Sequence, residues 1–152
     1  MRLFEVYNKE DFKYPLVISL PHSDQAIPEP VRQRMLPKVV SPNMDWFLPE
    51  LYAFFKPMGV TVLINNISRY MADPNRDAEI TGNGEYSQTI VYQKTTWDRQ
   101  MYEMPLISRE IAERIQNFLF AVSYGFEGAA GAKAGAVWEG IPAGPPQLCQ
   151  LF

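Results

Sequence analysis

The fold of this chain is decided by two apolar stretches, YPLVISL at residues 14–20 and VTVLI at residues 60–64. Each is short, continuous and apolar, which favours a strand buried inside a sheet. DWFLPELYAFF at residues 45–55 lies between them and repeats its apolar residues at helical spacing. A strand, a helix and a second strand in this order predict a parallel pair joined by a right-handed crossover.

The predicted helix over residues 45–55 has sequence signals at both ends. Asn43 or Asp45 can cap its amino end, and Pro49 falls early enough to be tolerated near the first turn. The segment from Pro57 to Gly59 is expected to end it. Its apolar stripe is formed by Trp46, Leu48, Leu51 and Phe55.

The rest of the ordered chain reads as two more helices separated by a long loop. Residues 29–35 favour a short helix, and residues 71–103 read as a polar, turn-rich excursion long enough to suggest a function. Together these elements predict an α/β fold with an open, mostly parallel sheet flanked by helices. The last helix is amphipathic, with its stripe on Leu106, Ile107, Ile111, Ile115 and Phe118.

Composition and charge narrow the class of protein. A chain of 152 residues with 47% hydrophobic residues and a net charge of −3 predicts one globular domain without affinity for nucleic acid or an anionic membrane. No apolar run approaches the roughly 20 residues of a membrane span. The first residues lack the apolar core of a secretion signal, and the single cysteine, Cys149, excludes an internal disulfide. We therefore expect a soluble cytoplasmic protein.

Chemistry is expected where the two strands end, because ligands of open α/β sheets bind beyond the carboxyl ends of their strands. His22 follows the first strand, and residues 66–70 follow the second. A lone histidine more often has a structural or surface role, but His22 is placed to bind a metal or act as a general base. Arg69 and Arg76 suit a dicarboxylate ligand, because guanidinium groups bind carboxylates through paired hydrogen bonds. The alternative for each arginine is a surface ion pair.

Three segments of the chain follow one another in a distinctive order: PLVISLPHSDQAIP from residue 15, NMDWFLPELY from residue 43 and SRYMADPNRD from residue 68. Together they resemble the motifs of the N-formylglutamate amidohydrolase family. That family has a Pro-His-Ser-Gly loop, an acidic residue before a Trp-containing helix, and a Ser-Arg-Tyr segment that leads into Asp-x-Asn-Arg. The resemblance covers residues 4–117, and QKTTWDRQMYE at residues 93–103 is similar to the family's Thr-rich segment.

The resemblance implies a zinc-peptidase-like α/β hydrolase that removes the formyl group from N-formylglutamate, giving glutamate and formate in histidine degradation. It also implies zinc or another divalent metal, with His22 and Asp45 carried over as ligands. The substrate, an N-acyl amino dicarboxylate, would be bound by Arg69, Arg76, Asn75 and Ser23. The motifs single out no catalytic base, and the open possibilities are Glu50, Glu79, Glu85 and Glu103.

The chain also departs from the family pattern. Asp24 replaces a glycine beside His22, and Pro74 replaces an apolar residue in the third motif. The family's second half carries a Pro-Tyr-His segment and an Asp-x-His-Ser segment, and neither occurs here. With one histidine the chain cannot complete a two-histidine metal site, so we expect weak or absent metal binding and little hydrolysis.

Residues 118–152 differ in composition from residues 1–117. They contain six of the nine glycines and read as a Gly/Ala/Pro-rich tail without helical or strand periodicity. Read one nucleotide later, the possible codons of residues 118–123 can spell Phe-Tyr-Leu-Pro-Tyr-His, and those of residues 137–148 can spell a segment containing Leu-Asp-Leu-His. We interpret the tail as an out-of-frame reading of the family's second half. The alternative is a natural, divergent tail.

Two further interpretations of function stay open. A non-catalytic module would use Arg69 and Arg76 to bind a carboxylate without a metal, whereas a structural fragment would bind no ligand. In either case an unfinished parallel sheet would leave an exposed edge, which favours self-association.

Overall fold

The structure is a computed structural model that describes residues 2–37, 39, 45–76, 89–119 and 147–150, with single positions at 125, 128 and 131. For residues 147–150 only the backbone is described. No helix within this part of the chain is long and apolar enough to cross a lipid bilayer.

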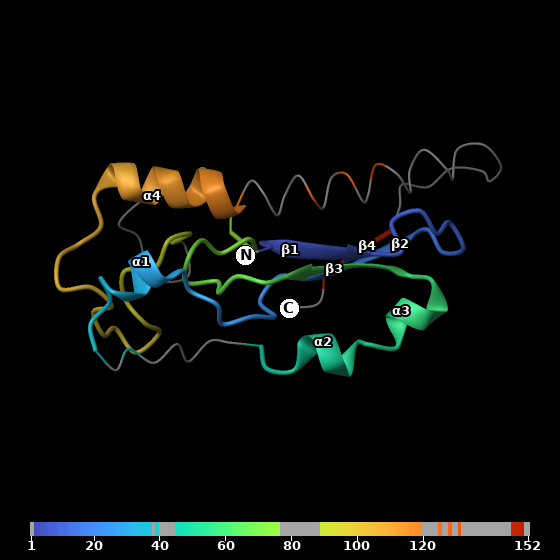
Figure 1. Cartoon of the computed structure of the whole chain (residues 1–152), viewed down its shortest axis with the longest axis horizontal. Coiled ribbons are helices and arrows are strands. Elements are labelled where there is room, and N and C mark those ends of the chain that lie inside the picture. Colours follow the sequence, from blue (N-terminus) through green and yellow to red (C-terminus); the bar gives the residue numbers. More distant parts are fainter. Residues whose placement is uncertain are drawn as a thin grey trace.

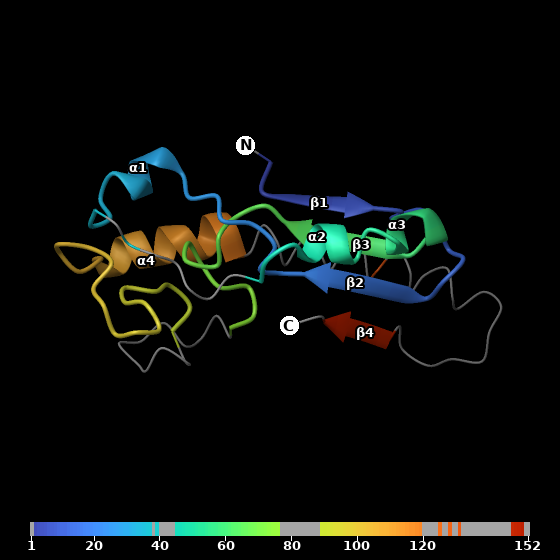
Figure 2. The same ribbon diagram turned by 90° about the horizontal axis from the view of Figure 1, so that it is seen from below.

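A four-stranded open sheet forms the centre of the fold, in the order β1-β3-β2-β4 (Figures 1 and 2). Strand β2 pairs in parallel with both β3 and β4, whereas β1 pairs antiparallel with β3, so the sheet is mixed. The register of the central pair places Ile18 beside Val62 and Leu20 beside Ile64. The strands are β1 (Phe4–Tyr7), β2 (Leu16–Leu20), β3 (Thr61–Asn65) and β4 (Gln147–Gln150).

The two strands predicted from the apolar stretches are confirmed as β2 and β3, and they pair in parallel as expected. Both are buried along almost their whole length, as continuous apolar runs predict. Strand β1 was missed because its four residues are only half-buried and lie among charged residues, which weakens the strand signal. Its antiparallel pairing is why the sheet is mixed.

Two short helices cover one face of this central pair, where the sequence predicted a single helix over residues 45–55. They are α2 (Leu48–Leu51) and α3 (Phe55–Met58), and both lie below the sheet in Figure 1. The chain leaves helical geometry between them, at Tyr52, where φ is −101°. The predicted stripe is wrong at Trp46 and Leu51, which are exposed, although Leu48 is buried.

The ends of this helical region also differ from the prediction. Asp45 does not cap α2, because the helix begins three residues later, at Leu48, and no side chain caps it. The other predicted cap, Asn43, lies outside the described residues. The carboxyl end agrees with the sequence: α3 ends at Met58, and Gly59 follows with φ 86°, a conformation that favours glycine.

The remaining helices lie beyond the carboxyl ends of β2 and β3 (Figure 2). Helix α1 (Glu29–Arg32) is the predicted short helix, and α4 (Ser108–Arg114) begins the predicted amphipathic one. The latter continues as a π-helical turn, Ile115–Leu119. Its stripe is confirmed at Leu106 and Ile115, which are buried, but Ile107 is exposed.

A second apolar core lies with these helices, and it corrects the interpretation of residues 71–103 as a polar excursion. Its buried members from this region are Ala72, Ile90, Val91, Tyr92, Met101 and Tyr102, and Tyr70 just before the region belongs to the same core. They occur singly or in short runs, so they form neither a helical nor a strand periodicity. They meet because the chain folds back: the Met101 amide donates to the Gln93 carbonyl at 2.9 Å. Residues 77–88 of the same region lie outside the described part.

Candidate active site

The loops after β2 and β3 meet at one edge of the sheet, as the parallel pairing requires. The Asn65 side chain donates to the carbonyls of Pro21 and Ile67, at 2.7 and 2.9 Å. The Ser23 hydroxyl contacts the carbonyls of Leu20 and Asn65, at 2.8 and 3.0 Å. This hydroxyl therefore joins the two loops in the present structure, and a role in binding substrate stays a prediction.

His22 lies at this edge with a carboxylate beside each ring nitrogen. Nδ1 lies 3.0 Å from Oδ2 of Asp45, and Nε2 lies 2.8 Å from Oδ1 of Asp73. The His22 side chain is only 2% exposed. Asp45 is 30% exposed, whereas Asp73 is completely buried. The histidine is thus contacted by a fully buried carboxylate on its inner side and by a partly exposed one on its outer side.

Asp73 is the centre of the buried side of the site. Its Oδ2 atom accepts hydrogen bonds from Arg69 Nε at 3.1 Å, Arg69 Nη2 at 2.6 Å and the Tyr92 hydroxyl at 2.6 Å. Its Oδ1 atom, besides facing His22, accepts from the Asn75 amide at 2.9 Å. Asn75 therefore helps to shape this loop through its backbone.

The surroundings of Asp73 keep it ionised. Burial alone would raise the pKa of this carboxyl, but the hydrogen bond and charge of His22, together with the charge of Arg69, hold the pKa of Asp73 well below its usual range. Burial and then the negative charge of Asp73 raise the pKa of Tyr92. The phenol therefore stays protonated and donates to Asp73.

The two arginines reach the same carboxylate in different ways. Arg69 is 11% exposed and donates to both Asp73 and, at 3.4 Å, the Tyr92 hydroxyl. Arg76 is 29% exposed, and its Nε lies 3.8 Å from Oδ2 of Asp73. That Nε is buried without a hydrogen-bond partner among the described residues. Arg69 is thus committed to the protein interior, whereas Arg76 is the more exposed of the two arginines.

Asp73 and Tyr92 were missed as site residues by the sequence analysis. Asp73 opens the Asp-x-Asn-Arg motif and stands four residues after Arg69, a spacing that suits an ion pair. That signal was available in the sequence. Tyr92 offered none, because it comes from a segment beyond residues 77–88 and reaches the site only through folding.

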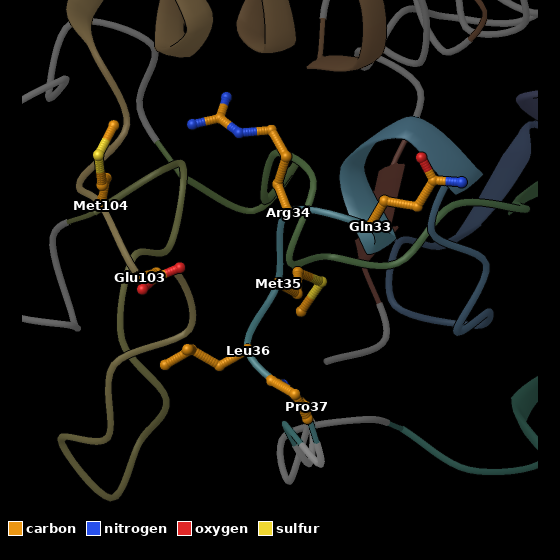
Figure 3. Close-up of a pocket in the computed structure, with 7 residues that line it drawn as sticks. All are labelled: Gln33, Arg34, Met35, Leu36, Pro37, Glu103 and Met104. Carbon is orange, nitrogen blue, oxygen red and sulfur yellow. The ribbon is translucent and has the colours of Figure 1, made fainter.

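The conceivable bases do not converge on His22 in the described part of the chain. Glu50 is exposed on α2, and Glu79 and Glu85 lie outside the described residues. Glu103 is exposed and lines a separate pocket of about 410 Å³ (Figure 3). That pocket has no other predicted site residue in its lining, which consists of Gln33, Arg34, Met35, Leu36, Pro37, Glu103 and Met104.

The donor types at His22 fit a divalent metal, but the set is incomplete. A metal-binding histidine commonly donates its second N–H to a carboxylate, which is how Asp73 faces Nε2. Nδ1 and the Asp45 carboxylate would then be the two ligands. Catalytic zinc usually has three protein ligands. Within the described residues no group of three or more His, Cys, Asp or Glu side chains is placed to hold a metal ion.

Two solved structures share this fold. An N-formylglutamate amidohydrolase from Ralstonia eutropha JMP134 superimposes with a TM-score of 0.70 and 22% identity, covering 87% of this chain and 52% of that one. A gene product of Agrobacterium tumefaciens superimposes with a TM-score of 0.68 and 13% identity, covering 90% and 52%. At these identities the likeness concerns the fold alone. This chain spans about half the length of both.

Sequence comparison points in the same direction. An N-formylglutamate deformylase from Pseudomonas putida is 35% identical over 65 residues, which is 42% of this chain and 24% of that protein. A second one, from Pseudomonas aeruginosa, is 29% identical over 100 residues, covering 64% and 38%. The profile described as N-formylglutamate amidohydrolase matches residues 14–120, which include both central strands and every residue of the site around His22. The chain therefore belongs to the N-formylglutamate amidohydrolase family.

Proposed function

We propose that this chain carries one half of the active site of a metal-dependent hydrolase that removes the formyl group from N-formylglutamate. The observation that carries the proposal is the meeting of His22, two carboxylates and two arginines at one sheet edge. A zinc-peptidase-like architecture, a cytoplasmic location and a place in histidine degradation belong to the same proposal. Two relatives in sequence are N-formylglutamate deformylases, which supports it.

Each residue has a distinct role in this proposal. His22 Nδ1 and Asp45 would hold a divalent metal, which when bound polarises the formyl carbonyl and makes a bound water a better nucleophile. Asp73 holds the imidazole in place through Nε2. Arg76 would bind a carboxylate of the substrate, and Arg69 supports it by neutralising Asp73 from the buried side.

We propose that the 152-residue chain by itself hydrolyses this substrate weakly or not at all. His22 and Asp45 are two of the three protein ligands that a catalytic zinc usually has. Neither a third ligand nor a general base reaches His22 within the described residues. We propose that the third ligand comes from the segment that the family carries after residue 117. For the base, Glu79 and Glu85 stay open as well, because they lie outside the described residues.

We further propose that residues 118–152 are an out-of-frame reading of that segment. Part of the support is forced by the genetic code: shifted by one nucleotide, Trp138-Glu139 must encode glycine followed by lysine or arginine. Sequencing the coding DNA across codons 115–152 tests the idea. The next frame should spell the Pro-Tyr-His and Asp-x-His-Ser segments, and any other reading makes the tail a native one.

Activity is tested by comparing this chain with a frame-corrected chain, in which the codons after residue 117 are read in the next frame. Glutamate release from N-formylglutamate and zinc per chain are measured for both. The frame-corrected chain should hydrolyse the substrate and hold about one zinc, and His22→Ala should abolish both properties. Normal turnover with one tightly held zinc in the 152-residue chain would contradict the predicted loss of activity.

A carboxylate-binding module is the second candidate, and the partial exposure of the Arg76 side chain, which is 29% exposed, favours it. It predicts saturable binding of glutamate, measured by calorimetry, that a chelator does not change. Arg76→Ala should abolish this binding, whereas His22→Ala should leave it intact. Equal loss in both variants would favour the metal-dependent enzyme.

Self-association with a second copy is a further proposal for the chain as it stands. Large apolar side chains on and around α2 and α3 are exposed, and such patches commonly mediate contact between chains. Light scattering at increasing protein concentration should show a dimer or larger species, and Leu51→Glu should weaken it. The exposed residues are Trp46, Phe47, Leu51, Phe54 and Met58.

A further inference from the structure

The turn between Asp45 and α2 contains a residue in a backbone conformation that its type rarely adopts. Phe47 has φ 61° and ψ 19°, which lies in the left-handed region. Within the described chain the other non-glycine residues with positive φ are Asn8 and Asp98. Asparagine and aspartate tolerate this region, whereas a bulky residue there is a genuine outlier. The surrounding structure must therefore hold Phe47 in place.

Contacts on both sides of Phe47 define the turn. On one side, Oδ2 of Asp45 lies 3.0 Å from Nδ1 of His22. On the other, Leu48 is buried in the core beneath the sheet, and the Leu51 amide donates to the Phe47 carbonyl at 2.9 Å. Asp45 and Leu48 are separated by two residues only. A left-handed residue turns the chain sharply enough for both contacts to form.

Packing of the aromatic ring does not account for this conformation. The Phe47 side chain is 72% exposed. The Trp46 ring lies 6.3 Å away, centroid to centroid, and is itself exposed, so the pair buries little surface. The backbone of Phe47, rather than its ring, is therefore the feature that the site uses.

We propose that Phe47 is a positioning residue, whose left-handed backbone turn directs the Asp45 carboxylate toward Nδ1 of His22. The inference rests on the proposed function in taking Asp45 and His22 as a working pair. The test of this inference depends neither on turnover nor on a bound metal. The inference can therefore fail while the proposed function holds, and the proposed function can fail while the inference holds.

The experiment uses His22 as a spectroscopic reporter, because it is the only histidine of the chain. Two-bond ¹H–¹⁵N spectra of the imidazole are recorded at one fixed pH on protein without a histidine tag. Asp45→Asn weakens the contact between residue 45 and Nδ1 of His22, so its spectrum is the reference for a weakened contact. Phe47→Gly and Phe47→Asn remove the ring but tolerate the left-handed region, whereas Phe47→Val keeps an apolar side chain and disfavours that region strongly.

The expected result separates the backbone from the ring. Phe47→Gly and Phe47→Asn should keep the wild-type Nδ1 and Nε2 resonances, and Phe47→Val should move them to the positions seen in Asp45→Asn. The opposite pattern, with the resonances kept by valine and lost in glycine and asparagine, would overturn the proposal. Leu51→Val is the matched control for a β-branched residue at an exposed position nearby, and it should leave the resonances unchanged.

A second measurement keeps the proposal testable if Phe47→Val does not fold. The midpoints of urea unfolding are compared for Phe47→Gly and Phe47→Ala, which both lack the ring. Glycine should give the higher midpoint, because only alanine is penalised in the left-handed region. A higher midpoint for alanine would show that the turn makes no such demand, and the proposal would be wrong.

Discussion

The side of His22 that faces the protein interior and the side that faces Asp45 differ in the number of groups around them. On the inner side, the fully buried Asp73 receives hydrogen bonds from His22, Arg69 and Tyr92. On the outer side, the described residues supply one hydrogen-bond partner, the partly exposed Asp45. This chain therefore contains the groups that position a histidine, whereas the groups that would react beside it are sparse in the described residues.

Removing the Asp73 carboxylate is expected to have the largest effect. Asp73→Ala leaves His22, Arg69 and Tyr92 buried without their acceptor, and breaking a buried pair in this way costs about 3–5 kcal/mol. Urea unfolding of the 152-residue chain measures the change. Glu113→Ala on α4, which removes an exposed ion pair with Arg109, is the control and should change little. Equal losses of unfolding free energy in the two variants would mean that the network around Asp73 contributes no more to stability than an exposed ion pair does.

Removing one donor from the same network should have a smaller effect. Tyr92→Phe keeps the buried ring and deletes the hydroxyl that donates to Asp73 at 2.6 Å. A hydrogen bond to a charged group contributes about 1.5–3 kcal/mol. In protein that already carries Asp73→Ala, Tyr92→Phe should lower the free energy of unfolding much less. An equally large decrease in that background would mean that the hydroxyl acts through some other contact.

Acid should weaken the inner side selectively. The pKa of folded Asp73 lies below its usual range, so its contribution to stability is complete above the unfolded value of about 3.9. That contribution is lost as the pH falls from there toward the folded pKa, because the unfolded chain then binds a proton that the folded one does not. Unfolding midpoints measured from pH 5 to pH 3 should fall more steeply for the wild type than for Asp73→Asn. Parallel curves would assign the acid sensitivity to other carboxyls.

The outer side should contribute least to stability. Asp45→Asn alters a partly exposed contact, for which we expect about 0–1 kcal/mol in urea unfolding. In the frame-corrected chain the same variant should lose bound zinc, since an amide is a poor substitute for a carboxylate ligand. A large loss of stability with zinc retained would show that Asp45 belongs to the structural side of His22.

Prediction from the sequence succeeded where a local pattern carries the information. The two central strands are continuous apolar runs, and their parallel pairing brings the loops after residues 20 and 65 together. The positions of His22 and Arg69 at that edge followed from this, whereas Arg76 was assigned through the family motif. Prediction failed for β1, a short strand without a strong pattern, and for the single helix over residues 45–55.

Local sequence patterns were therefore enough to predict the central strand pair, the edge at which chemistry is expected and, through the motifs, the family. The folded structure was needed to show that Asp73 is the buried partner of His22, that Tyr92 joins it, and that Arg69 turns inward while Arg76 stays more exposed. The reason is the range of the interactions. Strand and helix patterns arise from neighbours along the chain, whereas a buried polar network is satisfied by groups that folding brings together from distant segments.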